Sequence, residues 1–116
     1  MKNLKEFKEL IIRYETITFE EICEKWNDAD IFHAERITGF GDSDTCTLCQ
    51  STIVNGIVSC SLCVWGNGGD AQCNWGPHRD TYFMVGYANT PEELLTAFRL
   101  RAAHMRKHLK SIGVDF

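Results

Sequence analysis

The sequence lacks any apolar run long enough to cross a membrane. A spanning helix needs about 20 consecutive, mostly apolar residues, and charged or polar residues interrupt every apolar stretch of this 116-residue chain before that length. The opening residues, MKNLKEFKELIIRY, alternate charged with apolar side chains instead of forming the apolar core of a signal peptide. We therefore expect no membrane association and a cytoplasmic location.

The chain also lacks an excess of basic residues. It has 12 Lys and Arg against 16 Asp and Glu, which gives a formal net charge of -4 and a pI near 5.5. Non-specific binding to nucleic acid depends on clustered Lys and Arg that neutralise phosphates. We therefore do not expect binding of that kind.

Low-complexity segments, internal repeats and long polar tracts are absent as well, which argues against a disordered chain. A hydrophobic content of 44% and a charged content of 24% are typical of a folded globular domain. The length suits one domain. We expect a single domain over 1–116, with a helical part at 1–40, a cysteine-rich insert and loop at 41–79, and a second helical part at 80–116.

Helical periodicity marks the N-terminal part. A first amphipathic helix is predicted by apolar residues at helical spacing, which are Leu4, Phe7, Ile11 and Tyr14. A second helix is predicted from Thr18, which has capping-box spacing to Glu21. Its apolar stripe includes Cys23, which we expect to be buried. The segment DADIFHAERI is also predicted to be helical and to end before Gly39.

The C-terminal part carries the strongest helix signal. Thr90 is a predicted N-cap, Pro91 takes the first helical position and Glu93 completes a capping box. The predicted apolar face consists of Leu94, Phe98, Met105 and Leu109, flanked by Leu95, Ala102 and the aliphatic part of Arg101. The preceding segment DTYFMVGYA fits a helix or a strand, and we favour a helix.

Cysteine, in contrast, is plentiful, with six residues in the chain. Four of them form two Cys-x-x-Cys pairs, Cys46 with Cys49 and Cys60 with Cys63. Asn55-Gly56, between the pairs, is the strongest two-residue hairpin signal, and a hairpin there would bring the pairs together. In a reducing cytoplasm such pairs are typical of tetrahedral zinc. The sequence therefore predicts a zinc-ribbon-like β-hairpin with one structural zinc.

Other roles for these thiols remain open at the level of the sequence. They could be core thiols or a redox pair, and Cys73 could replace one of the four predicted ligands. A spare buried thiol is the simpler interpretation of Cys73.

Two histidine patterns resemble metal sites but are better explained otherwise. His33 and Glu35 precede Cys46 as in zinc deaminases, but the ten intervening residues are too few for the strand and helix that such a site requires. His104 and His108 have the spacing of two zinc ligands without the Glu of His-Glu-x-x-His. We expect this pair to be structural, with its charge favourable near a helix C-terminus.

The Gly- and Trp-rich segment 64–80 is a candidate binding loop. Large flat side chains and a planar cation are typical anchors for a protein partner or a nucleotide base. The predicted binding residues are Trp65, Asn67, Trp75, His78 and Arg79. The alternative is that both tryptophans only cover the core of the metal module.

The stretches TGFGDSDTCTLC, CSLC and TPEELLTAFRLRAAHMRKHL together resemble small phage and prophage proteins in which a double Cys-x-x-Cys module sits between helices. The likeness covers residues 37–109. It implies a metal-binding accessory protein of unassigned activity, with Cys46, Cys49, Cys60 and Cys63 at the motif positions. It also implies a viral protein acting in the cytoplasm of a bacterial host.

These observations predict an α+β fold that is mainly helical, with the zinc-ribbon-like hairpin inserted between N-terminal helices and a long C-terminal helix. The leading functional hypothesis is a non-catalytic, zinc-stabilised protein that binds and modulates a host macromolecule, most simply a host protein. The alternative is a protein that sequesters a nucleotide-type signal through Trp75, His78 and Arg79. A third hypothesis is an enzyme using Cys73, His78 and Asp80, although no complete set of nucleophile, base and orienting residue can be assembled.

Overall fold

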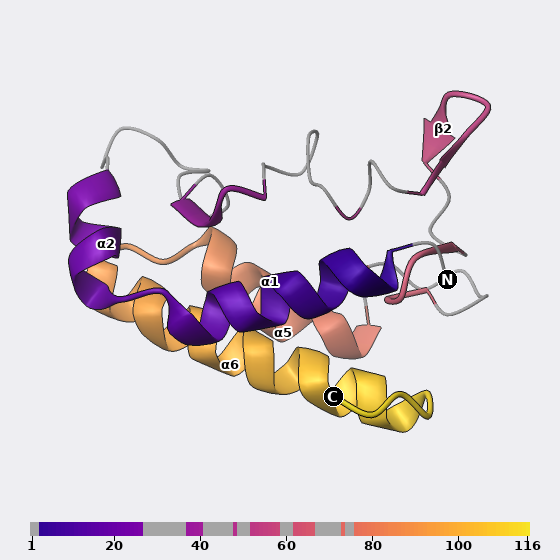
Figure 1. Ribbon diagram of the computed structural model, residues 1–116. Coiled ribbons are helices and arrows are strands. Elements are labelled where there is room, and N and C mark those ends of the chain that lie inside the picture. The colour runs from indigo at the N-terminus through magenta and orange to yellow at the C-terminus, as the bar shows by residue number, and fades with distance from the viewer. Residues whose placement is uncertain are drawn as a thin grey trace.

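The protein is mainly helical in the part that the computed structural model describes, which is residues 3–26, 37–40, 48, 52–58, 62–66, 73 and 76–116. Its helices are α1 (Leu4–Thr16), α2 (Phe19–Lys25), α5 (Arg79–Gly86) and α6 (Pro91–Ser111). A 3-10 turn, Gly76–His78, leads into α5. The strands β1 (Ile53–Val54) and β2 (Ile57–Val58) complete the described elements (Figure 1).

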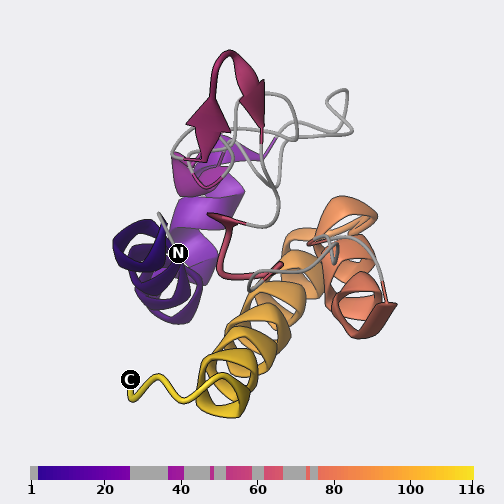
Figure 2. The same ribbon diagram turned by 90° about the vertical axis from the view of Figure 1, so that its right-hand side faces the viewer.

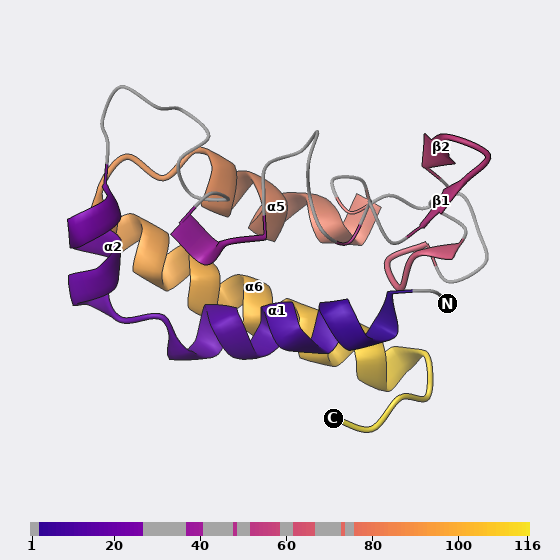
Figure 3. The same ribbon diagram turned by 45° about the horizontal axis from the view of Figure 1, so that its top comes forward.

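Helix α6 is the centre of the fold, and α1, α2 and α5 all pack against it. It starts as the sequence predicts, because the Thr90 hydroxyl accepts a hydrogen bond from the Glu93 amide at 3.1 Å and Pro91 follows. The apolar face is confirmed, since Leu94, Phe98, Met105 and Leu109 are all buried. Figure 3 shows α1 running along α6, with α5 beside α6 as well.

Helices α1 and α6 run antiparallel and share one apolar core. Phe7, near the start of α1, lies 6.2 Å from the ring of His108, while Tyr14 stacks on Phe98 at 5.0 Å. The predicted core residues Phe7, Ile11 and Tyr14 are buried, as the periodicity requires. This core joins the two ends of the chain.

Two arginines link the helices, Arg13 joining α1 to α2 and Arg106 joining α6 to α1. Arg13 donates to both carboxylate oxygens of Glu21 at 2.8 and 2.6 Å and to the carbonyls of Ile37 and Thr38. Arg106 makes a two-point ion pair with Glu15 at 2.6 and 2.8 Å. Planar, two-point pairs of this kind fix orientation better than single contacts.

Two expectations for the N-terminal part have different outcomes. The Thr18 cap is present, since its hydroxyl accepts from the Glu21 amide at 3.2 Å. Cys23, however, is exposed, so the prediction that it is buried is wrong. Helix α2 is only seven residues long and buries Ile22, and the next residue points about 100° away around the helix. Of the helix predicted over 28–37, residues 28–36 lie outside the described residues.

The segment before α6 is helical, which confirms the favoured assignment of residues 80–86. The short hairpin lies where Asn55-Gly56 predicts it, with Ile53 opposite Val58 and Val54 opposite Ile57. Asn55 and Gly56 both have positive φ, 52° and 78°, as a type I′ turn requires. The hairpin projects away from the helices, at the end of the molecule where α1 begins and α6 ends (Figures 1 and 2). Among the described helices, none is long and apolar enough to span a membrane.

Candidate functional site

The Asn3 side chain, just before α1, makes three hydrogen bonds to distant parts of the chain. Asn3 is 0% exposed. Its Nδ2 donates to the Leu48 carbonyl at 3.1 Å and to Sγ of Cys63 at 3.0 Å, and its Oδ1 accepts from the Val64 amide at 2.8 Å. Asn3 stands at the N-cap position of α1 but makes no side-chain cap. Its amide serves the cysteine-bearing segments instead.

The partners of Asn3 come from both Cys-x-x-Cys pairs. Leu48 lies between Cys46 and Cys49, and Cys63 is the last cysteine of the second pair. One nitrogen atom therefore contacts the backbone of the first pair and a sulfur of the second. Leu48 and Cys63, 15 residues apart in the sequence, therefore both contact the same side-chain amide.

The sulfur of Cys63 is a type of donor that zinc binds, and it lies within hydrogen-bonding distance of the Asn3 amide. A neutral thiol is a weak hydrogen-bond acceptor, whereas an ionised sulfur accepts strongly. A buried amide N–H at 3.0 Å matches the outer hydrogen bonds that orient and stabilise metal-bound sulfur. No disulfide joins the three cysteines that the structure describes, Cys23, Cys63 and Cys73. The donor type and its hydrogen bond therefore fit zinc.

The other predicted ligands, Cys46, Cys49 and Cys60, lie outside the described residues. Within the described ranges, no group of three His, Cys, Asp or Glu side chains could hold a metal ion. Cys73, the possible substitute ligand, packs half-buried against the core, and its carbonyl accepts from Arg101 at 3.0 Å.

A second cluster of polar groups, some buried and some half-buried, surrounds Trp65. The Trp65 ring is 3% exposed and contacts Phe7 edge-on at 4.9 Å between centroids. It also lies 4.5 Å from His78 and 5.3 Å from His108, and it stacks on His104 at 5.8 Å. These three histidines come from the turn before α5 and from α6, so the cluster joins both helices to Trp65.

Arg101 is the charged centre of this cluster. Its guanidinium carbon lies 4.2 Å from the Trp65 ring centroid, although the residue is only 5% exposed. Nη1 donates to the His78 carbonyl and the Thr81 hydroxyl, both at 2.8 Å, and Nη2 donates to Cys73. A buried cation is tolerated when hydrogen bonds and an aromatic face replace water. Arg101 thereby holds Cys73, His78 and Thr81 against α6.

The histidines of the cluster are held by hydrogen bonds. Nδ1 of His78 lies 2.8 Å from Nε2 of His104, and Nε2 of His108 lies 2.7 Å from the Val64 carbonyl. The first contact needs at least one neutral ring, because two imidazolium N–H groups cannot bond to each other. Burial, with nearby His108, His104 and Arg101, lowers the pKa of His78 to about 4. Burial and Arg101 also lower the pKa of His104.

The predicted binding loop is only partly at the surface. Trp65 and His78 lie in the interior, so neither anchors a partner on the surface as predicted; packing against Phe7 and Arg101 holds them there. Arg79 is exposed, with its guanidinium 5.3 Å from the Phe83 ring centroid. Asn67 and Trp75 lie outside the described residues. Burial and Arg101 lower the pKa of His104, which disfavours the charged ring expected near the C-terminus of the helix.

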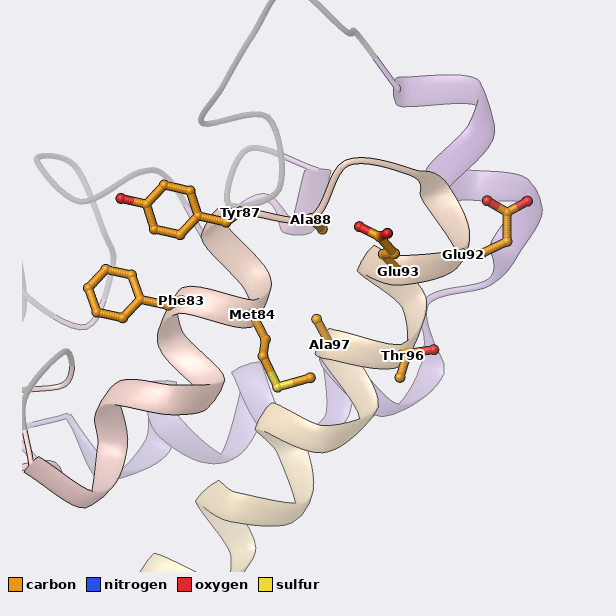
Figure 4. Close-up of a pocket in the computed structure, with 8 residues that line it drawn as sticks. All are labelled: Phe83, Met84, Tyr87, Ala88, Glu92, Glu93, Thr96 and Ala97. Atoms are coloured by element: carbon orange, nitrogen blue, oxygen red, sulfur yellow. The ribbon is translucent and has the colours of Figure 1, made fainter.

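A groove between α5 and the first turns of α6 is a surface feature that the sequence did not indicate. Its volume is about 440 Å³. The lining residues are Phe83, Met84, Tyr87, Ala88, Glu92, Glu93, Thr96 and Ala97 (Figure 4). Tyr87 is 72% exposed and Met84 is 40% exposed. Apolar side chains that are exposed together mark interaction surfaces more often than scattered ones do.

The resemblance to phage proteins stays a prediction and assigns no role to the residues of the groove. Compared with models of protein families, with curated proteins and with solved structures, the chain matches none.

Proposed function

We propose that this protein is a non-catalytic binding protein in which one structural zinc ion, held by Cys46, Cys49, Cys60 and Cys63, stabilises the cysteine-bearing segments on the helices. The observation that carries the proposal is the Asn3 side chain, which contacts both Cys-x-x-Cys pairs and donates to a sulfur. Four thiolates fill the tetrahedral coordination of zinc and leave no position for water or substrate.

The contacts of the three histidines support a non-catalytic role. His78 and His104 bond to each other, and His108 bonds to a backbone carbonyl. Catalytic acids and bases must reach a substrate, whereas the His78 ring is buried and the half-buried rings of His104 and His108 pack on Trp65. Their hydrogen bonds and packing are those of a structural cluster.

The partner in this proposal is a host protein in a bacterial cytoplasm, as the resemblance to phage proteins implies. The net charge of -4 favours a protein partner over nucleic acid. The nucleotide-binding alternative relied on Trp75, His78 and Arg79. Because His78 is buried, its ring is not available to a nucleotide at the surface, and Trp75 lies outside the described residues.

The test compares two cysteine variants. Cys60→Ser removes a proposed ligand, whereas Cys23→Ser changes an exposed cysteine on α2. Metal analysis and native mass spectrometry of protein purified from bacterial cells should find zinc in the wild type and in Cys23→Ser, and should find it lost in Cys60→Ser. Equal zinc content in both variants would reject the ligand set. A turnover of substrate that depends on His78 or Cys73 would reject the non-catalytic role.

A further inference from the structure

The groove between α5 and α6 is lined by apolar and aromatic side chains. In Figure 4, Met84 from α5 points toward Ala97 of α6, whereas the rings of Phe83 and of Tyr87, the C-cap residue of α5, extend on the other side of α5. The rings of Phe83 and Tyr87 stack at 5.4 Å between centroids. Tyr87 and Met84 keep large exposed fractions although they belong to a packed helix pair. This arrangement leaves an apolar surface between two helices.

The α6 side of the groove is acidic. Glu92 and Glu93 both line it and are exposed. Glu93 accepts the Asn89 amide with Oε2 at 2.8 Å, and within the described ranges Glu92 makes no ion pair. Glu15 and Glu21 differ, because each is held by an arginine of this chain. Arg79, near Phe83, is not among the lining residues.

We propose that this groove binds an amphipathic helix of a partner protein that carries a large apolar side chain and, about one turn away, Lys or Arg. The apolar side chain packs on Met84 and Ala97 beside Phe83 and Tyr87, and the basic side chain pairs with Glu92 and with Glu93. A groove between two helices accepts the side-chain ridge of a third helix. The inference rests on the proposed function and names the surface and the class of partner.

The charge of the groove decides between possible occupants. Carboxylates on the rim repel nucleic acid and anionic lipid surfaces, both of which attract basic residues. They attract Lys and Arg, which increases the association rate and favours partners of that charge. A helix with acidic flanks is disfavoured for the same reason.

The test uses the full-length, zinc-loaded protein and two fluorescent peptides of about 18 residues. One peptide is an amphipathic helix with Leu on one face and Lys and Arg on the other, and its control has Glu at every basic position. Fluorescence anisotropy should show binding of the basic peptide, weakened by salt, and at least tenfold weaker binding of the acidic one. Met84→Glu and Glu92→Lys should each weaken binding of the basic peptide about tenfold or more.

Two surface variants on α1 serve as matched controls. Glu9→Lys makes the same change of net charge as Glu92→Lys, at an exposed site outside the groove. Ile12→Glu places a charge on an exposed apolar residue of α1, which is 47% exposed. Both should bind the basic peptide within about twofold of the wild type. If Glu9→Lys weakens binding as much as Glu92→Lys, attraction by net charge explains the binding and the inference is wrong.

Zinc content and sedimentation separate the remaining outcomes. Zinc-loaded protein that does not bind the basic peptide rejects the groove and leaves the proposed zinc-stabilised protein intact. Protein purified without zinc rejects the proposed function itself. A wild-type dimer that Met84→Glu converts to monomer assigns the groove to a second copy of this chain and overturns the inference.

Discussion

The side-chain amide of Asn3 lies 3.0 Å from Sγ of Cys63 and 3.1 Å from the carbonyl of Leu48, so a single buried side chain joins α1 to both cysteine pairs. Asn3 therefore connects the helical core directly to the proposed zinc site. Loss of zinc should loosen the first turn of α1, and a change at Asn3 should weaken zinc binding.

Replacement of Asn3 tests this connection. Asn3→Ala leaves the Val64 amide and the Leu48 carbonyl without their partner and should lower the free energy of unfolding by about 2–3 kcal/mol. It should also speed the transfer of zinc to a chromogenic chelator, because Cys63 loses its N–H donor. Asn89→Ala, at an exposed position, is the control. A purely structural role predicts lower stability with an unchanged rate of zinc transfer from the folded protein.

Replacement of Arg101 tests the Trp65 cluster. Lys cannot donate to the His78, Thr81 and Cys73 oxygens in the same planar geometry, so Arg101→Lys should lower the free energy of unfolding by about 2–3 kcal/mol. Arg79→Lys, on the exposed side of α5, should change it by less than about 0.5 kcal/mol. Urea unfolding of the two variants measures the difference. Equal effects would mean that the buried contacts of Arg101 contribute little.

The stability of the protein should depend on pH through His78. Its pKa in the folded protein, about 4, is lower than its ordinary value of 6.5, so the unfolded chain binds more protons between these pH values. The contribution of His78 to stability is therefore complete above pH 6.5 and is lost as the pH falls toward 4, by on the order of 2 kcal/mol. His104 acts in the same direction.

Urea unfolding at a series of pH values checks this dependence. His78→Asn should flatten the curve between pH 6.5 and 4. Glu21→Gln should leave the curve above about pH 5 unchanged and act between about pH 5 and 2, because Arg13 lowers the pKa of Glu21 from 4.5 to about 2. A wild-type curve that is flat from pH 6.5 to 4 would contradict the neutral, buried state of His78.

Two glycines should respond oppositely to alanine. Gly56 has a φ of 78° in the hairpin turn, so Gly56→Ala should destabilise the hairpin by about 1 kcal/mol. Gly86 ends α5 and has open space where a Cβ would lie, so Gly86→Ala should be neutral or stabilise by up to about 1 kcal/mol. Amide hydrogen exchange locates each effect. Equal protection of residues 53–58 in wild type and Gly56→Ala would contradict the strained turn.

Local signals predicted much of the helical fold. The capping box at Thr90 and the stripe from Leu94 to Leu109 fix the start and the buried face of α6, and both are present. Such features depend on residues within a few positions of one another. The error at Cys23 arose because periodicity does not show how much of a short helix its neighbours cover.

The candidate site was harder to predict because its contacts join distant segments. Asn3 looks like an ordinary helix cap, and its partners are 45 to 61 residues away. Arg101 was expected to bury only its aliphatic part, since the sequence does not show that His78, Thr81 and Cys73 supply acceptors for the guanidinium. The groove likewise requires α5 to lie beside α6.

The most direct measurement is native mass spectrometry of the wild type, Cys63→Ser and Cys73→Ser, each purified without added metal. We predict one zinc per chain in the wild type and in Cys73→Ser, and its loss in Cys63→Ser, the ligand that Asn3 contacts. A wild-type chain without zinc, or zinc that survives Cys63→Ser and is lost in Cys73→Ser, would contradict the proposed zinc site.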